Sequence, residues 1–193
     1  MELLARMGIG HLLVIDGDKI AAHNLNRQLL ATQNNLGEAK VVAAKERVAA
    51  INGGVKVDIH QLWLSAGNAK ELLAPAQVVV DALDNIPGRF LLQDTIRELN
   101  IPLVHGAIGG YQGQVMTIFP ADPGLDLIYP AGRASGDKGA EVQLGNPAAT
   151  PAMVAAWQVQ EVVKIILGQG ELLRNRLLFF DAYSGRAEVF TVG

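Results

Sequence analysis

The stretch Gln77–Asn85, with the sequence QVVVDALDN, decides the fold. Its uninterrupted apolar run predicts a strand that is buried on both faces, as the strands of parallel sheets are. The run LLVI at residues 12–15 is similar, and it is also followed by acids, Asp16 and Asp18. Ligands of open α/β sheets bind beyond the carboxyl ends of the strands, so we expect the acids after both runs to face a ligand.

Strand and helix patterns alternate around these two runs. Strand patterns are expected at residues 11–15, 55–59, 77–81 and 102–107. Helical patterns are expected at residues 2–7, 24–31, 37–51, 69–73 and 88–100. This alternation predicts an α/β fold with a mostly parallel sheet that is flanked by helices.

The pattern changes after Gly109. We expect a strand at residues 114–119, a helix at 152–167, and a closing hairpin with strands at 177–181 and 187–192. These elements predict that the C-terminal part of the sheet is antiparallel. Residues 120–151 are rich in Gly, Pro and Ala without clear periodicity, and we expect a long crossover there.

Length and composition favour a single globular domain over residues 1–193, since half of the 193 residues are hydrophobic. A net charge of −3 with dispersed acids and bases gives no basic stripe, so DNA is not an expected partner. No apolar run is long enough to span a membrane and no signal peptide is recognisable, so we expect no membrane partner and a cytoplasmic location. The chain has no cysteine, which excludes disulfides, a thiolate nucleophile and cysteine-bound zinc.

A group of amide and cationic side chains lies in sequence between the two strands that end in acids. The sequence NLNRQ contains Asn24, Arg27 and Gln28, and Lys40 follows twelve residues after Gln28. Arginine and lysine bind phosphoryl groups, while carboxylates suit a ribose or a divalent metal ion. Together these side chains predict a nucleoside triphosphate as the ligand.

Seven short motifs resemble, in order and spacing, those of the ubiquitin-like-protein activating enzymes of the ThiF, MoeB and HesA type. They are IDGD at 15–18, NLNRQ at 24–28, GEAK at 37–40, DALDN at 81–85, PLVHGA at 102–107, GQV at 113–115 and FDA at 180–182. The resemblance implies a Rossmann-like fold and ATP-dependent adenylation of the C-terminal Gly-Gly carboxylate of a small ubiquitin-like sulfur-carrier protein. It also implies Mg²⁺ as a cofactor and a homodimeric enzyme.

The resemblance further implies roles for individual residues. Asp16 would bind the ribose hydroxyls, with Asp18 as its neighbour. Arg27 and Lys40 would hold the triphosphate as the catalytic cations. The alternatives are a turn acid for Asp16 and solvated helix faces for both cations.

Asp84 completes the implied catalytic set as the Mg²⁺ ligand, because a hard cation takes carboxylate and phosphate oxygens together. Its alternative is a helix N-cap, and Asn85 is expected to shape the site. Asp81 is expected only to end its strand, and His105 to be a packed or hydrogen-bonded strand residue rather than a base. Two amides would orient phosphate or the incoming carboxylate, unless they cap a helix: Asn24 and Gln28.

The sequence departs from the family pattern in two ways. The paired Cys-x-x-Cys motifs of many relatives are missing, so no zinc is expected and residues 121–133 need another source of stability. The family's first strand, its glycine-rich turn and the start of the next helix are also missing, which predicts an N-terminally incomplete domain and favours a fragment. The crossover at 120–151 is a candidate mobile segment over the partner's tail, with a plain connection as the alternative.

Three other functions remain open. The chain could be a non-catalytic scaffold or partner subunit of the same family, which ATP–pyrophosphate exchange would reject. It could adenylate a carboxylate on modified tRNA, against which the acidic balance argues. A dinucleotide-dependent oxidoreductase is the last alternative, but it gives Arg27 and Lys40 no role.

Overall fold

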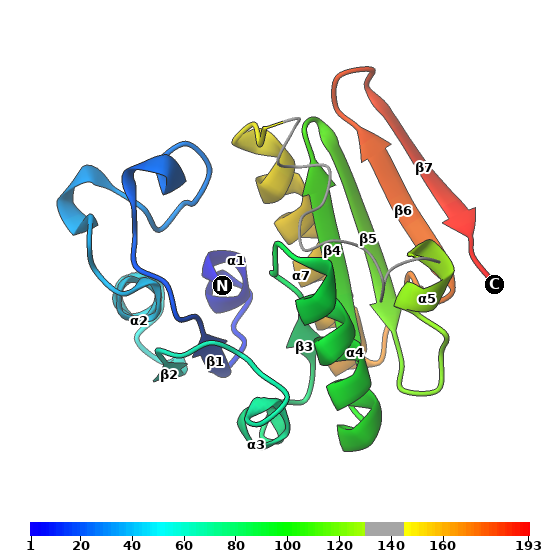
Figure 1. Cartoon of the computed structure of the whole chain (residues 1–193), viewed down its shortest axis with the longest axis horizontal. Coiled ribbons are helices and arrows are strands. Elements are labelled where there is room, and N and C mark those ends of the chain that lie inside the picture. Colours follow the sequence, from blue (N-terminus) through cyan, green and yellow to red (C-terminus); the bar gives the residue numbers. More distant parts are fainter. Residues whose placement is uncertain (130–144) are drawn as a thin grey trace. The chain divides into compact units, whose positions relative to one another are not determined.

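The computed structural model describes residues 1–129 and 145–193, and these form two compact units (Figure 1). Unit 1 comprises Met1–Leu64 and unit 2 comprises Ser65–Gly193. Each unit has its own sheet, of two strands in unit 1 and of five strands in unit 2. The single nucleotide-binding domain expected over residues 1–193 stays a prediction.

Unit 1 combines a parallel pair of strands with two α-helices. The strands are β1 (His11–Ile15) and β2 (Lys56–His60), paired along their whole length. Helix α2 (Lys40–Ile51) packs on both strands and on α1 (Glu2–Arg6). Three buried side chains at helical spacing form the packed face of α2: Val41, Ala44 and Val48. The strands and helices expected around residues 2–15 and 37–59 are confirmed, with ends shifted by at most three residues.

The expected helix over residues 24–31 is wrong. The structure has two short 3₁₀ turns in this region, η1 (Ala22–Asn24) and η2 (Gln33–Asn35). The side-chain oxygen of Asn24 accepts from the Ala21 N–H at 2.9 Å, and that of Asn35 accepts from the Thr32 N–H at 2.8 Å. Such local side-chain bonds compete with the helical backbone pattern, so they favour turns.

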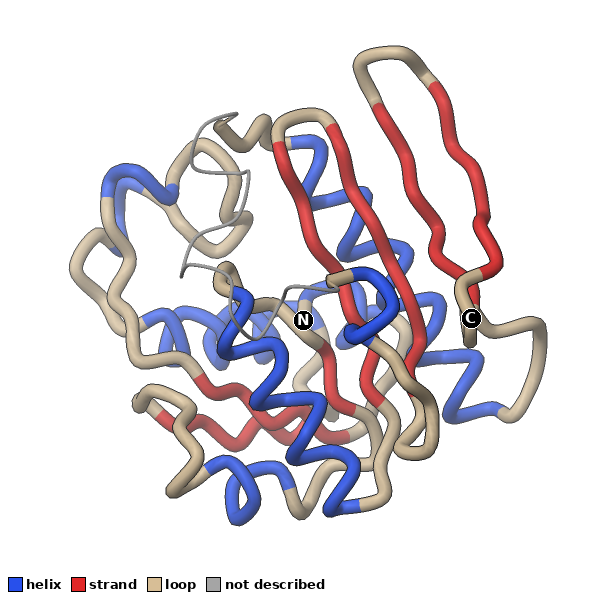
Figure 2. The backbone as a smooth tube through the Cα atoms, turned by 45° about the vertical axis from the view of Figure 1, so that its right-hand side comes forward, coloured by secondary structure: helices blue, strands red, loops and turns tan. Residues whose placement is uncertain are grey.

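Unit 2 is built on a five-stranded sheet in the order β3-β4-β5-β6-β7 (Figure 2). Strand β3 (Val79–Val80) pairs with β4 (Leu103–Gly109) in parallel. The remaining pairs are antiparallel and involve β5 (Gln112–Ile118), β6 (Arg176–Asp181) and β7 (Arg186–Thr191). The predicted α/β fold, with parallel pairing followed by an antiparallel C-terminal part, is confirmed.

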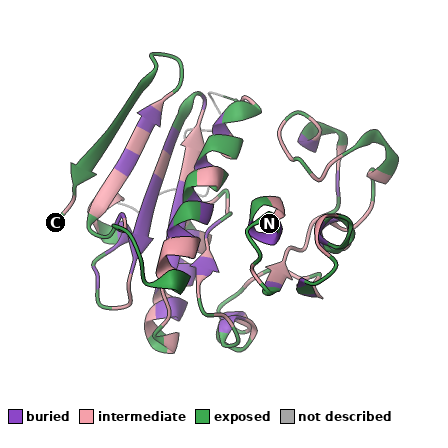
Figure 3. Cartoon of the chain, turned by 180° about the vertical axis from the view of Figure 1, so that it is seen from behind, coloured by how far each residue is buried: buried purple, intermediate pink, exposed green. Residues whose placement is uncertain are grey.

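Helices cover both faces of this sheet (Figures 1 and 3). Helix α4 (Ile86–Leu99) packs on β4 and on the short α3 (Ala69–Leu73). Helix α7 (Ala149–Leu167) packs on β4 and β5 from the other face and buries Val154, Val159 and Val162. The predicted helices at 69–73, 88–100 and 152–167 are therefore confirmed. None of the helices in the described ranges has the length and apolar character needed to cross a membrane.

The expected crossover at 120–151 is only partly described, because residues 130–144 lie outside the described residues. The described part contains α5 (Leu125–Ile128). The buried Asp122 carboxylate accepts from Arg174 at 2.7 Å and from the Phe119 N–H at 2.9 Å, and Gln93 Oε1 accepts from the Leu125 N–H at 2.6 Å. These bonds stabilise residues 119–125 without any cysteine.

Candidate functional site

Three of the predicted ligand residues of unit 1 gather where β1 ends. Lys40 Nζ lies 2.7 Å from Asp18 Oδ2 and 3.9 Å from Asp16 Oδ2. Asp16 Oδ1 also accepts from the Asp18 N–H at 2.8 Å, which fixes the loop between the two acids. The Lys40 side chain is only 16% exposed, so protein groups rather than water surround most of it. The structure thus brings Asp16, Asp18 and Lys40 together as one cluster.

Backbone pairing explains why residues so far apart in sequence meet. Lys19 and Ala39 form an antiparallel bridge, and the Ile20 N–H donates to the Glu38 carbonyl at 2.8 Å. The Lys40 N–H then donates to the Asp18 carbonyl at 3.0 Å. This pairing places the first residue of α2 beside Asp18, at a helix N-terminus, which is a favourable place for phosphate.

The motif NLNRQ begins with Asn24 at the end of η1 and continues through the turn that follows, which contains Arg27. Asn24 is the last residue of η1 and is 2% exposed, and its side-chain oxygen accepts from the Ala21 N–H. The helix at 24–31 that Asn24 was expected to cap in its alternative role is not formed. Arg27 Nη1 donates to the His23 carbonyl at 2.8 Å, and the Gln28 N–H donates to the Asn24 carbonyl at 2.9 Å. Within the described residues, no hydrogen bond or ion pair joins Arg27 or Gln28 to Lys40.

Unit 2 carries the predicted metal ligand. The N-cap of α4 is Asn85, whose Oδ1 accepts from the Gly88 N–H at 2.8 Å. Asp84 is exposed, and its Oδ1 lies 3.3 Å from Asn85 Nδ2. Asn85, and not Asp84, therefore caps α4, and the Asp84 carboxylate remains accessible to a cation. Among residues 1–129 and 145–193, no group of three or more His, Asp or Glu side chains could hold a metal ion alone.

A buried polar network supports the loop that carries Asp84, and the sequence analysis missed it. Asp81 is 1% exposed, and its Oδ2 lies 2.7 Å from His105 Nδ1 and 3.5 Å from Arg89 Nε. Arg89 Nη2 donates to the Leu83 carbonyl at 2.8 Å. Arg89 therefore connects the carboxylate that ends β3 with the backbone one residue before Asp84.

The network continues from His105 to Gln114 on the neighbouring strand β5 and to Tyr129. Gln114 Nε2 lies 3.1 Å from His105 Nε2 and 2.8 Å from Tyr129 Oη, to which Arg89 also donates at 3.2 Å. Burial lowers the pKa of His105 below 6.5; the hydrogen bond and charge of Asp81 oppose this, and the charge of Arg89 adds to it. His105 is neutral at pH 7, with Nδ1–H donating to Asp81 and Nε2 accepting from Gln114. One sequence signal pointed to it: a polar residue at 105 in the otherwise apolar strand β4.

A close approach of α7 completes the support of this loop. Gln158 Nε2 donates to the Asp81 carbonyl at 2.7 Å and to the Val104 carbonyl at 3.2 Å. A Cβ at Gly106 would lie 2.5 Å from the same nitrogen, so only glycine leaves room for this side chain. Gln158 thus supplies the hydrogen bonds where the pairing of β3 with β4 ends.

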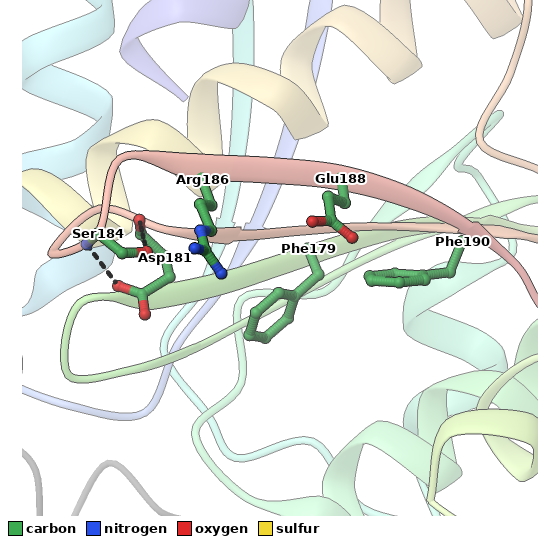
Figure 4. Close-up of a pocket in the computed structure, with 6 residues that line it drawn as sticks. All are labelled: Phe179, Asp181, Ser184, Arg186, Glu188 and Phe190. Carbon is green, nitrogen blue, oxygen red and sulfur yellow. Dashed lines mark hydrogen bonds between the residues drawn. The ribbon is translucent and has the colours of Figure 1, made fainter.

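A separate pocket lies on the β6–β7 hairpin (Figure 4). Side chains from both strands and from the turn line it: Phe179, Asp181, Ser184, Arg186, Glu188 and Phe190. It contains none of the residues predicted to bind nucleotide. We therefore do not assign it to the nucleotide site.

Comparison with known proteins relates the chain to one family. The ThiF family model matches residues 1–193. The chain is 36% identical over 182 residues to the SAMP-activating enzyme E1 of Haloferax volcanii, covering 94% of this chain and 67% of that protein. It is 33% identical over 198 residues to the sulfur carrier protein adenylyltransferase of Thermus thermophilus, covering 100% of this chain and 73% of that protein.

Other similar proteins are longer than this chain. The adenylyltransferase and sulfurtransferase MOCS3-2 of Zea mays is 35% identical over 194 residues, and the chain spans 39% of its length.

Two solved structures show the same fold: PaaA, with a TM-score of 0.80 and 21% identity, and MccB of E. coli with AMPCPP and MccA, with a TM-score of 0.79 and 19% identity. The match covers 99% and 100% of this chain and 59% of each of theirs. The resemblance found from the motifs is confirmed, and the chain belongs to the ThiF family.

Proposed function

We propose that this protein adenylates the C-terminal carboxylate of a small ubiquitin-like sulfur-carrier protein with ATP. Its similarity to proteins named as a sulfur carrier protein adenylyltransferase and a SAMP-activating enzyme supports this function. The observation that carries the proposal is the cluster of Lys40 with Asp16 and Asp18 at the carboxyl end of β1. It combines a cation for phosphate with carboxylates for ribose hydroxyls.

In the proposed reaction the carrier's carboxylate oxygen attacks the α-phosphorus of ATP. A bond between that oxygen and the α-phosphorus forms, the bond from the α-phosphorus to the bridging oxygen breaks, and pyrophosphate leaves. The reaction requires no protein nucleophile, which agrees with a chain that has no cysteine. Lys40 and Arg27 would neutralise the phosphoryl charge, and positioning would supply most of the remaining rate enhancement.

Asp84 is the residue that we propose holds Mg²⁺. It fits this role because its carboxylate is exposed while Asn85 provides the cap of α4. A metal held by one protein carboxylate completes its coordination with phosphate oxygens and water. When bound, Mg²⁺ would supply charge neutralisation on the phosphates.

We further propose that Asp81, Arg89 and His105 position Asp84 without touching ATP. The bond from Arg89 to the Leu83 carbonyl restrains the backbone next to Asp84, and the bond from His105 to Asp81 orients the carboxylate beside Arg89. Buried polar groups that hydrogen-bond to one another in this way hold a loop in one conformation.

ATP–pyrophosphate exchange in the presence of a Gly-Gly-ended carrier tests the function. We expect carrier-dependent exchange that falls about 100-fold in Asp84→Ala, because one group that stabilises the phosphoryl charge is lost. Glu98→Ala is the matched control, since Glu98 is another exposed acid of unit 2 and is paired with Lys70. ATP binding without pyrophosphate exchange would instead favour the alternative that the chain is a non-catalytic partner subunit.

A further inference from the structure

The turn after α2 contains an asparagine that is followed by a glycine, Asn52-Gly53, and no other asparagine of the sequence precedes a glycine. In such a pair the glycine nitrogen can attack the asparagine side-chain amide, because glycine has no Cβ to hinder the approach. Gly53 and Gly54 are exposed, so water reaches the turn. Among residues 1–129 and 145–193 the Gly53 N–H has no hydrogen-bond acceptor, which leaves its nitrogen available for this attack.

The side chain of Asn52 holds both this turn and α1. Its Oδ1 accepts from the Gly54 N–H at 3.1 Å, and its Nδ2 donates to the Ala5 carbonyl at 3.2 Å. Ala5 is fully buried, and its helix α1 packs on α2, which Asn52 ends as the C-cap. A single amide group thus connects the end of α2 to α1.

The folded conformation opposes the attack. The backbone of Asn52 is extended, with φ −151° and ψ 97°, and ring closure requires ψ to rotate until the Gly53 nitrogen faces Asn52 Cγ. This rotation breaks the bond from the Gly54 N–H to Oδ1 and the bond from the Val55 N–H to the Asn52 carbonyl, at 3.2 Å. Turning the amide towards Gly53 also breaks its bond to Ala5. The reaction therefore requires a local opening of the contact between Asn52 and α1.

We propose that Asn52 is a site of spontaneous deamidation, protected while α1 packs on α2, and that its modification keeps α1 from packing again. The Gly53 nitrogen forms a bond to Asn52 Cγ and loses its proton, the bond from Cγ to Nδ2 breaks, and ammonia leaves with that proton. Solvent water then opens the resulting succinimide. Addition at Cγ gives aspartate, and addition at the backbone carbonyl carbon of residue 52 gives isoaspartate.

The product disfavours the packed position of α1 for two reasons. A carboxylate has no N–H to donate, so it would place an oxygen against the Ala5 carbonyl oxygen. Its negative charge also lies at the C-terminus of α2, where the helix dipole favours cations. Opening permits the reaction and the product stabilises the open state, so Asn52 acts as a one-way switch within unit 1.

Peptide mapping by mass spectrometry, after incubation at mildly alkaline pH, tests the chemistry. We expect residue 52 of the folded parent to deamidate at least about tenfold more slowly than residue 52 of the parent in urea, because folding restrains the turn. Gly53→Ala should slow the reaction about tenfold in both states, since its Cβ hinders the nitrogen. A Cβ at this position meets no atom within 4 Å, so the variant should fold. Absence of deamidation at residue 52 in urea overturns the site.

Two leucines of α1 form a matched pair that tests the protection. Leu4 is buried and Leu3 is exposed. Leu4→Ala should speed deamidation of the folded protein about tenfold, because α1 opens more often, whereas Leu3→Ala should leave the rate unchanged. In urea both variants should react as fast as the parent. Equal rates in the two folded variants overturn protection by α1.

A surface variant tests the same contact if Leu4→Ala fails to fold. Arg47 of α2 pairs with Glu2 of α1 at 3.0 Å, and both of its donor nitrogens contact that carboxylate. Arg47→Ala removes this ion pair without opening the core, and deamidation in its folded state should be faster than in the parent. An unchanged rate in Arg47→Ala also overturns protection by α1.

Hydrogen exchange tests the consequence of the modification. Asn52→Asp represents the aspartate product and keeps an acceptor for the Gly54 N–H. Amides of residues 2–9 should exchange about tenfold faster in Asn52→Asp than in the parent, and those of β4 should exchange equally in both. Equal exchange of residues 2–9 in the two proteins overturns the switch. None of these readouts involves nucleotide, so their outcome is independent of the proposed function.

Discussion

Lys40 has surroundings that differ from those of every basic neighbour on its helix. It is mostly buried and paired with Asp18, whereas Lys45 on the same helix is exposed. We expect Lys40→Met to lower ATP–pyrophosphate exchange about 100-fold, because a fixed cation is lost from the phosphate site. Lys45→Met should leave exchange unchanged. The unfolding free energies of both variants should lie within about 1 kcal/mol of that of the parent. Asp16 and Asp18, which lose their cationic partner in Lys40→Met, are partly exposed and can be solvated by water.

Equal exchange in the two lysine variants would contradict the role of Lys40. Urea unfolding followed by circular dichroism separates a loss of activity from a loss of structure. The comparison is informative because the two substitutions remove the same group from one helix.

His105 predicts how the stability of the protein depends on pH. Its pKa in the folded protein is lowered from 6.5, so the unfolded chain binds a proton at a pH where the folded protein does not. Stability from this group is present above about pH 6.5 and is lost as the pH falls towards the folded pKa. The parent should therefore lose more unfolding free energy between pH 7.5 and 5.5 than His105→Gln, measured by urea denaturation. Equal losses would mean that His105 titrates normally in the folded state.

At the level of elements, two adjacent residues at the start of α4 have different roles: one is structural and the other is proposed to be functional. Asn85 caps the helix, while its neighbour Asp84 is exposed. Asn85→Ala should cost about 1 kcal/mol of unfolding free energy, and Asn85→Asp should keep most of the cap. Asp84→Ala should change stability by less than about 0.5 kcal/mol. A large loss of stability in Asp84→Ala would show that the acid, too, supports the helix.

Helix α7 is tied to the sheet by a buried acid. Glu161 is fully buried; its Oε2 accepts from Thr117 Oγ1 at 2.6 Å and from the Leu173 N–H at 2.8 Å, and it pairs with Lys164. Glu161→Ala should cost about 3 kcal/mol, because it leaves these donors without an acceptor. Gln160→Ala, at an exposed position of the same helix, should cost less than about 0.5 kcal/mol. Thermal and urea unfolding of both variants test the difference.

The elements also show how far the sequence could predict this protein. Apolar runs and helical periodicity located β1, α3 and α7 to within three residues, because burial dictates those patterns. The expected helix at 24–31 failed because Asn24 and Asn35 bond to nearby backbone groups, a choice that periodicity does not reveal.

The candidate site divides in the same way. Motifs identified Asp16, Asp18 and Lys40 individually, but their contact depends on pairing between residues 18–20 and 37–40. The link from Asp81 to His105 joins adjacent strands, and sequence spacing does not encode it.

Across the molecule as a whole, burial in the five-stranded sheet is uneven (Figure 3). Leu103, Val104 and Val115 in the inner strands are fully buried, whereas every residue of β7 is exposed. Amides of β7 should therefore exchange hydrogen at least about tenfold faster than those of β4 and β5, because local opening of the edge exposes little apolar surface. Exchange followed by mass spectrometry tests this gradient, and equal protection would imply that β7 is covered in solution.

The fit of Gly106 to Gln158 restricts how this domain can be redesigned. Any side chain at position 106 would expel Gln158 from the carbonyls of Asp81 and Val104. Shortening Gln158 alone would remove the side-chain donor to the Asp81 carbonyl, whereas the Val104 carbonyl keeps the Asp81 N–H at 3.0 Å. Positions 106 and 158 are therefore coupled, and we expect a substitution at either one alone to destabilise the fold. A library that samples them jointly should yield folded proteins that stepwise substitution cannot reach.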